Sequence, residues 1–289
     1  MTKNNLSSEF RKAFQVLADD PSPKVREALL EELRGAGEEA LDFLHHQAVT
    51  LGRWEAIAAR HFLEALARDH PTVEGLDFIR SMNYELETGL LILTRAVSPQ
   101  LNHSEFCFKL DQIAARAREL FAPPMSVREK CQLLNRVFFH EHGFRLVRRQ
   151  EEDTSLLLPQ EVLYTKRGGA FTLMLLYALI ATRCRLGLET VKAPGHFLLG
   201  CYEGKEPFFV DVHASGSLRW GSEVLANLQR EDASVSEMEL APTPVGEILT
   251  TYCQSLNVAF AREGRIDESR LFERFRKEFA EIYRRHAQP

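Results

Sequence analysis

The chain has 289 residues, of which 45% are hydrophobic and 27% charged, as is usual for a soluble globular protein. Its formal net charge is −5, which argues against nucleic acid or an anionic membrane as the main partner, because both bind basic surfaces. The longest apolar run, residues 170–181, is too short to cross a bilayer, and the polar N-terminus lacks the pattern of a signal peptide. The five cysteines contain no CxxC pair. We therefore expect a cytoplasmic protein without a cofactor or a metal site.

Residues 1–100 show only helical patterns. Apolar residues recur three and four positions apart, and Ser, Asp, Pro and Gly mark where each helix begins. Short consecutive helices of this kind are typical of a stacked array of the HEAT type, although there are too few units to define a repeat. The segment "AVSPQLNHS", around residues 96–104, interrupts the pattern and predicts a boundary.

Residues 101–225 combine helices with short strands. Two helices are followed by a short helical segment, a Gly-Gly turn and a long buried helix at about 172–187. Strands are expected at about 188–193, 196–202 and 207–212, with "EGKE" turning the last two into a hairpin. After a second boundary near residues 242–244, two helices close the chain within residues 240–289. The fold class predicted is α+β, mostly helical, with a small antiparallel sheet.

A histidine and an aspartate occupy the two strands of the predicted hairpin. The turn lies midway between His196 and Asp211, so antiparallel pairing would set them nearly opposite each other, with Cβ atoms about 5 Å apart. A carboxylate beside an imidazole fixes its tautomer and stabilises its protonated form, as a catalytic base requires. The alternative is a buried pair in which each residue only satisfies the other, which is the commoner situation.

Four segments in fixed order resemble the SirB1-type family of transglutaminase-like proteins. They are "LLNRVFFHEHGF" (133–144), the stretch 155–188 containing "RGGAFTL", "APGHFLL" (193–199) and "FFVDVHASG" (208–216). The resemblance implies a transglutaminase-like core of papain-like type at residues 101–225, between helical flanking regions. In that superfamily a cysteine at the N-terminus of a buried helix faces a histidine and an aspartate on adjacent strands.

The resemblance assigns the histidine to His196 and the aspartate to Asp211. The nucleophile position falls on Thr172, which is not a cysteine. Two interpretations of Thr172 remain open: a helix N-terminal threonine that caps a backbone N–H, or a hydroxyl nucleophile activated by His196. The first is favoured, since threonine is β-branched and hindered. Ala170 stands where the family tends to have proline, and none of the cysteines is well placed to replace the nucleophile.

Other residues near this motif are weaker candidates for binding. Gly168 and Gly169 could form an anion-binding nest beside Arg167, although a Gly-Gly pair is more often a tight turn. Asn135 could direct its amide at the site, but a buried capping or bridging role is more common. His140 and His142 lack a third ligand nearby in the sequence and are poor metal candidates.

Two functions follow. The first is a transglutaminase-fold protein without the usual cysteine that is either silent or an atypical amide or ester hydrolase or acyltransferase. In the active form Thr172 attacks a carbonyl, His196 is the base and Asp211 orients it, and helix N–H groups hold the oxyanion. The alternative is an inactive binding or scaffold protein whose helical region recognises a protein or peptide partner. Hydrolysis of activated esters by the wild type and by His196→Ala distinguishes the two.

Overall fold

The structure is a computed structural model that describes residues 6–20, 22–50, 53–69, 71–147 and 153–287. By contacts, the chain divides into two compact units. The first unit comprises residues 1–84, 92–99 and 278–289, and the second comprises residues 85–91 and 100–277. The expected three regions, 1–100, 101–225 and 240–289, stay a prediction about how the chain is organised.

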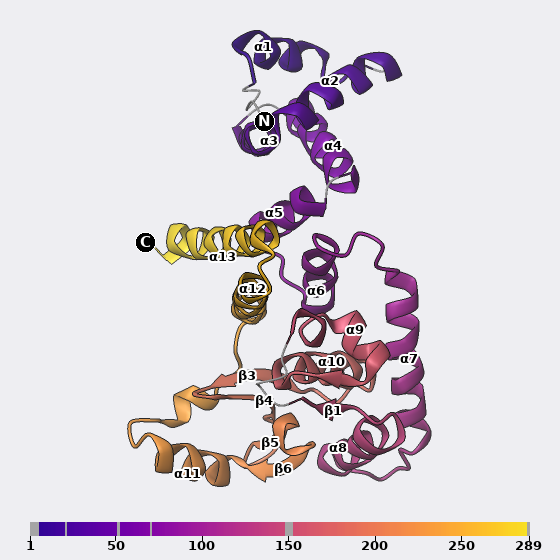
Figure 1. The fold of residues 1–289 in the computed structure, drawn as a ribbon, viewed down its shortest axis with the longest axis vertical. Helices are drawn as coiled ribbons and strands as arrows, with labels where there is room; N and C mark the ends of the chain where they lie inside the picture. The colour runs from indigo at the N-terminus through magenta and orange to yellow at the C-terminus, as the bar shows by residue number, and fades with distance from the viewer. Residues whose placement is uncertain (1–5, 21, 51–52, 70, 148–152, 288–289) are drawn as a thin grey trace. The chain divides into compact units, whose positions relative to one another are not determined.

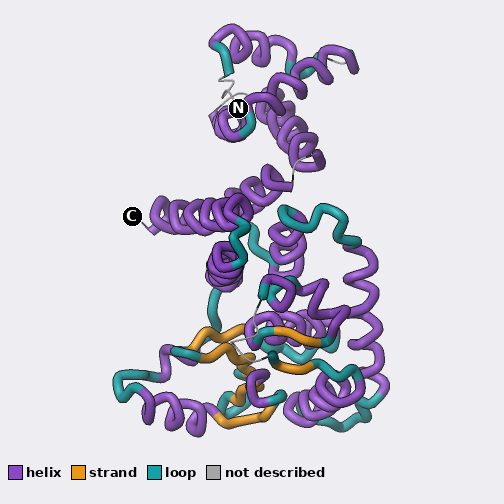
Figure 2. The backbone as a smooth tube through the Cα atoms, in the orientation of Figure 1, coloured by secondary structure: helices purple, strands orange, loops and turns teal. Residues whose placement is uncertain are grey.

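The first unit is built from helices (Figure 1, Figure 2). They are α1 (Ser8–Leu17), α2 (Pro23–Ala36), α3 (Glu38–Thr50), α4 (Arg53–Asp69) and α5 (Pro71–Ser81), and α6 (Leu86–Arg95) and α13 (Ile266–Ala287) have residues in both units. Ser7 caps α1 by accepting a hydrogen bond from the backbone N–H of Phe10 at 3.0 Å. The ring of Phe14 packs 5.3 Å from Phe43 and 5.1 Å from Phe62, centroid to centroid. The helical pattern predicted for this part of the chain is confirmed, and the HEAT-type array stays a prediction.

The second unit surrounds a small antiparallel sheet with helices. Its strands, in the order β3-β4-β5-β6, are β3 (Glu189–Ala193), β4 (His196–Cys201), β5 (Phe208–Asp211) and β6 (Ser217–Trp220). A separate parallel pair consists of β1 (Arg145–Leu146) and β2 (Arg167–Gly168). The helices of this unit are α7 (His103–Glu119), α8 (Val127–Asn135), α9 (Pro159–Thr165), α10 (Ala170–Arg183), α11 (Gly221–Glu231) and α12 (Val245–Arg262). The α+β, mostly helical fold class is therefore confirmed.

The three expected strands form at nearly the expected positions, whereas β1, β2, β6 and α11 are not predicted from the sequence pattern. Short strands such as β1 and β2 carry too few residues to show an alternating pattern. None of the described helices is both long enough and apolar enough to cross a membrane.

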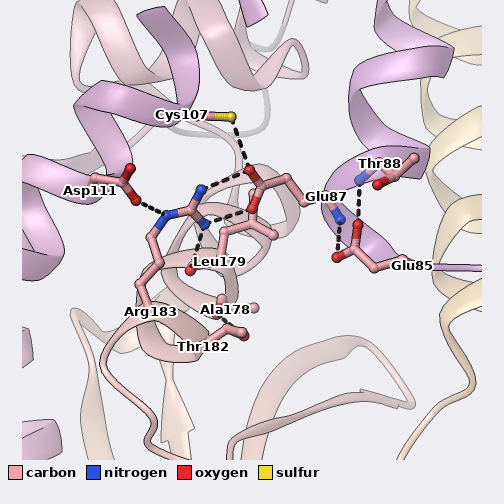
Figure 3. A network of polar contacts seen from close by, with 9 residues as sticks. All are labelled: Glu85, Glu87, Thr88, Cys107, Asp111, Ala178, Leu179, Thr182 and Arg183. Carbon is pink, nitrogen blue, oxygen red and sulfur yellow. Dashed lines mark hydrogen bonds and ion pairs between the residues drawn. The ribbon is translucent and has the colours of Figure 1, made fainter. Parts of the chain in front are cut away.

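Helix α10 lies at the centre of the second unit, and residues 171–181 are all buried. Its C-terminal end is held by a network of charged groups around Arg183 (Figure 3). The Arg183 guanidinium donates to the Glu87 carboxylate at 2.6 Å and to Asp111 at 2.6 Å, and the Cys107 thiol lies 3.1 Å from Glu87. Burial alone would raise the pKa of Glu87, but the hydrogen bonds from Arg183 and Cys107 bring that pKa below its ordinary value.

Candidate functional site

The first turn of α10 carries Thr172, the residue at the predicted nucleophile position. Thr172 is the third residue of the helix, and it is 0% exposed. Its hydroxyl is buried and has no hydrogen-bond partner among the residues that the structure describes. The N-cap residue is Gly169, which offers no side-chain hydrogen bond. The interpretation of Thr172 as a helix cap is therefore wrong, because its hydroxyl bonds to no backbone N–H.

His196 opens strand β4 directly after a two-residue turn. Pro194 and Gly195 form this turn, and Gly195 has a φ of +69°, as the third position of a type II turn requires. The turn sets His196 opposite Ala193 of β3, and the imidazole is half-buried. In the described part of the chain no hydrogen bond or ion pair involves the His196 side chain.

The pairing of β4 with β5 differs from the predicted hairpin. Leu199 pairs with Val210 and Cys201 with Phe208, so extending the ladder by one position sets Leu198 opposite Asp211. The prediction that His196 and Asp211 lie nearly opposite each other is wrong by two positions. Because the offset is even, both residues still belong to the same face of the sheet, as diagonal rather than direct neighbours.

Asp211 has partners other than the imidazole. One carboxylate oxygen accepts a hydrogen bond from the backbone N–H of Ala214 at 3.2 Å, which caps the short 3-10 turn after β5. The other oxygen lies 3.6 Å from the Arg219 guanidinium of β6. The predicted imidazole–carboxylate hydrogen bond is therefore not formed. Arg219 could not be predicted as a partner because β6 is not evident in the sequence. Ser217 pairs with Asp211, and Arg219 lies two positions further along β6, so its side chain is on the same face of the sheet as the aspartate.

Strand β4 directs Phe197, rather than its neighbour His196, toward helix α10. Phe197, the residue after His196, packs its ring 4.5 Å from that of Phe171 in the first turn of α10. Side chains alternate along a strand, so His196 belongs to the opposite face. The residues that share this face include Ala193 and Leu198, which join an apolar cluster with α11. No hydrogen bond between Thr172 and His196 occurs in the described part of the chain.

Asn135, at the end of α8, bridges two elements of the second unit. Its amide nitrogen donates to the carbonyl of Gly216, and its amide oxygen accepts from the Tyr177 hydroxyl of α10 at 2.8 Å. Gly216 has a φ of +80°, and a Cβ there would lie 2.2 Å from the Asn135 oxygen, so only glycine fits. The bridging role that was favoured for Asn135 is confirmed. The sequence does contain a signal for this bond: Tyr177 lies within the apolar run of α10, and a buried tyrosine hydroxyl needs a hydrogen-bond partner such as Asn135.

The Gly-Gly pair before α10 does not form an anion-binding nest. Gly169 is extended, with φ −67° and ψ 158°, and its N–H donates to the carbonyl of Leu156 at 3.2 Å. A Cβ on Gly168 would lie 2.6 Å from a methyl group of Val162, so this glycine is required by packing. The predicted nest is therefore not formed, and Arg167 lines a cavity together with residues of β1.

The cysteines are in surroundings that disfavour the thiolate. Burial raises the pKa of Cys131 to about 12 and that of Cys184 to about 11. Burial and the neighbouring Glu87 raise the pKa of Cys107 to about 11. Nucleophilic cysteines have lowered pKa values, so these thiols lack the electrostatics of a catalytic cysteine. No group of three His, Cys, Asp or Glu residues that could hold a metal ion occurs among the described residues.

Comparison with known proteins identifies the class of this fold. The family model of the transglutaminase-like superfamily matches residues 104–254, a little more than half of the chain. The chain therefore belongs to the transglutaminase-like superfamily. No curated protein and no solved structure matched the sequence.

Proposed function

We propose that this chain is a SirB1-type member of the transglutaminase-like superfamily that acts in the cytoplasm as a binding protein rather than as an acyl-transfer enzyme. The observation that carries the proposal is the state of Thr172. A nucleophile must reach a substrate carbonyl and pass its proton to a base. The Thr172 hydroxyl is fully buried and has no hydrogen-bond partner among the described residues, and it is Phe197 rather than its neighbour His196 that packs on the first turn of α10.

A labelling experiment tests this proposal. Alkyl fluorophosphonates modify hydroxyl groups that a neighbouring base activates, and intact-mass spectrometry counts the adducts. We expect no adduct on the native chain, and equal results for the wild type, Thr172→Val and His196→Ala. A single adduct that maps to Thr172 and disappears in both variants would contradict the proposal.

In this proposal the first unit binds a protein or peptide partner. A hollow of about 310 Å³ lies between α1 and α3, lined by charged and polar side chains around the ring of Phe43. Val16 and Val49 nearby in sequence are 75% and 84% exposed. A photo-crosslinking residue at the exposed Gln15 should trap the partner in cells, whereas the same residue at Lys205, in the second unit, should not. Equal crosslinking at the two positions would argue against recognition by the first unit.

A second candidate function is the atypical hydrolase or acyltransferase. What favours it is that His196 and Asp211 share one face of the sheet, and that the half-exposed imidazole has no partner among the residues that the structure describes. Hydrogen bonds of catalytic residues often form only with substrate bound. This candidate requires Thr172 to become accessible, so it predicts loss of ester hydrolysis in Thr172→Val and in His196→Ala alike.

A further inference from the structure

The hollow between α1 and α3 in the first unit is lined by one stripe of α3. The stripe runs from Glu39 through Asp42 to Gln47, with residues three and four positions apart, and Arg11 and Gln15 of α1 also line the hollow. Its volume of about 310 Å³ is at the lower end of the range of small-molecule sites, about 300–1,000 Å³. The hollow therefore has room for one long side chain of a partner rather than for a folded segment.

The charged groups around the hollow include more carboxylates than cations. Among the described lining residues Arg11 is the one arginine or lysine, and its guanidinium already lies 2.5 Å from the Glu39 carboxylate. Asp42 lies 3.0 Å from Arg80, but Arg80 also pairs with Glu278 at 2.7 Å. Three carboxylates thus share two guanidinium groups, and 69% of the Asp42 side chain is exposed to an incoming partner. Charge complementarity favours a cation in this hollow.

Gln47 provides an independent indication that a hydrogen-bond donor belongs in the hollow. The residue lines the hollow although it is only 6% exposed, and its amide oxygen has no hydrogen-bond partner among the described residues. An acceptor that is buried without a hydrogen bond destabilises the folded chain. A ligand with N–H groups would remove this penalty, whereas an ionised carboxylate has no hydrogen to donate.

We propose that the hollow binds a basic side chain, arginine or lysine, of the protein or peptide partner. Its N–H groups would donate to Gln47 and to the second carboxylate oxygens of Asp42 and Glu39, which have no partner among the described residues. Residues 1–84 contain 14 acidic and 10 basic residues, so the surroundings attract the same kind of partner. The inference rests on the proposed function, because it names the chemistry that the first unit recognises.

Fluorescence anisotropy of the full-length protein with a labelled peptide tests the proposal. The probe is a fluorescein-labelled peptide in which three arginines alternate with alanines. The same peptide with citrulline, the neutral analogue of arginine, or with glutamate serves for comparison. At about 50 mM sodium chloride, where electrostatic contacts are weakly screened, we expect the arginine peptide to bind at least about tenfold more tightly than either of the others.

Variants of the chain show whether the hollow is the site. Asp42→Asn and Gln47→Met should each weaken binding of the arginine peptide about threefold or more, because each removes an acceptor. Glu31→Gln is the matched control: it lies on an exposed position of α2 and changes the net charge by the same amount as Asp42→Asn, and it should leave the affinity within about twofold. Thermal unfolding without peptide checks the fold, and Gln47→Met should be at least as stable as the wild type, since it removes an unsatisfied oxygen.

Equal binding of the citrulline or the glutamate peptide would overturn the proposal. Equal weakening by Glu31→Gln would also overturn it, because the peptide would then respond only to the net charge of the chain. Crosslinking at Gln15 and Lys205 separates this result from the proposed function. If Gln15 traps a partner while the arginine peptide does not bind, only the basic side chain is refuted, whereas equal crosslinking at both positions contradicts recognition by the first unit itself.

Discussion

Replacing Thr172 by valine tests whether the buried hydroxyl in the first turn of α10 lowers the stability of the fold. The substitution exchanges the hydroxyl for a methyl group and keeps the β-branched shape. Leaving a buried hydroxyl without a hydrogen bond costs about 1–3 kcal/mol, and burying the added methyl group contributes in the same direction. Valine and threonine have similar helix propensities, so the helix itself contributes little to the difference. We expect Thr172→Val to raise the free energy of unfolding by about 1–3 kcal/mol.

Urea unfolding followed by tryptophan fluorescence measures this change. The chain has two tryptophans, and in a Trp54→Phe background the signal comes from Trp220 alone, which belongs to the second unit. In thermal unfolding followed by the same signal, the midpoint temperature should rise by about 2–4 °C for each kcal/mol. Thr172→Ser is the matched control, because it keeps the hydroxyl and removes the methyl group, and it should destabilise the second unit. A lower stability for Thr172→Val than for the wild type would show that the hydroxyl has a partner and would refute the reasoning.

The remaining predictions concern the contacts that hold the second unit together. Gly216→Ala should cost about 2–4 kcal/mol in urea unfolding, because the new Cβ combines positive φ with a clash against Asn135, whereas Gly264→Ala, with a φ of +74° but open space around it, should cost less. Arg183→Ala should cost about 1–3 kcal/mol, since it leaves Glu87 partly buried without its main partner, and a cost below about 0.5 kcal/mol would contradict the role of the network. The pKa of Glu87 is lowered in the folded chain, so the stability that it contributes is present above its ordinary pKa of 4.5 and is lost as the pH falls below it. The stability difference between the wild type and Glu87→Gln should therefore shrink below about pH 4.5, and a difference that does not change with pH would contradict this assignment.

The elements of the second unit could largely be predicted from the sequence, but their pairing could not. The apolar run of α10 and the three strands around His196 and Asp211 are clear periodic signals. The register was not readable, because the turn between β4 and β5 spans residues 202–207 and carries no two-residue turn motif that would fix it. A shift of two positions was enough to separate a predicted hydrogen-bonded pair.

The face of each strand also depends on tertiary packing. Alternation showed that His196 and Phe197 point in opposite directions, but only the contact between Phe197 and Phe171 shows which of them faces α10. The partners of Asp211 came from β6 and from a 3-10 turn, which have weak local patterns. The pairing of β1 with β2 was hidden for a similar reason, since Arg145 and Arg167 are far apart in sequence and pair only in the folded chain.

The central claim is that this transglutaminase-like domain does not assemble a nucleophile and its base. The most direct test is to measure the hydrolysis of 4-nitrophenyl acetate by the wild type, Thr172→Val and His196→Ala. We predict that the wild type shows no saturable turnover and that all three proteins give the same slow background rate. Saturable turnover by the wild type that is lost in both folded variants would contradict the claim and would establish Thr172 and His196 as a catalytic pair.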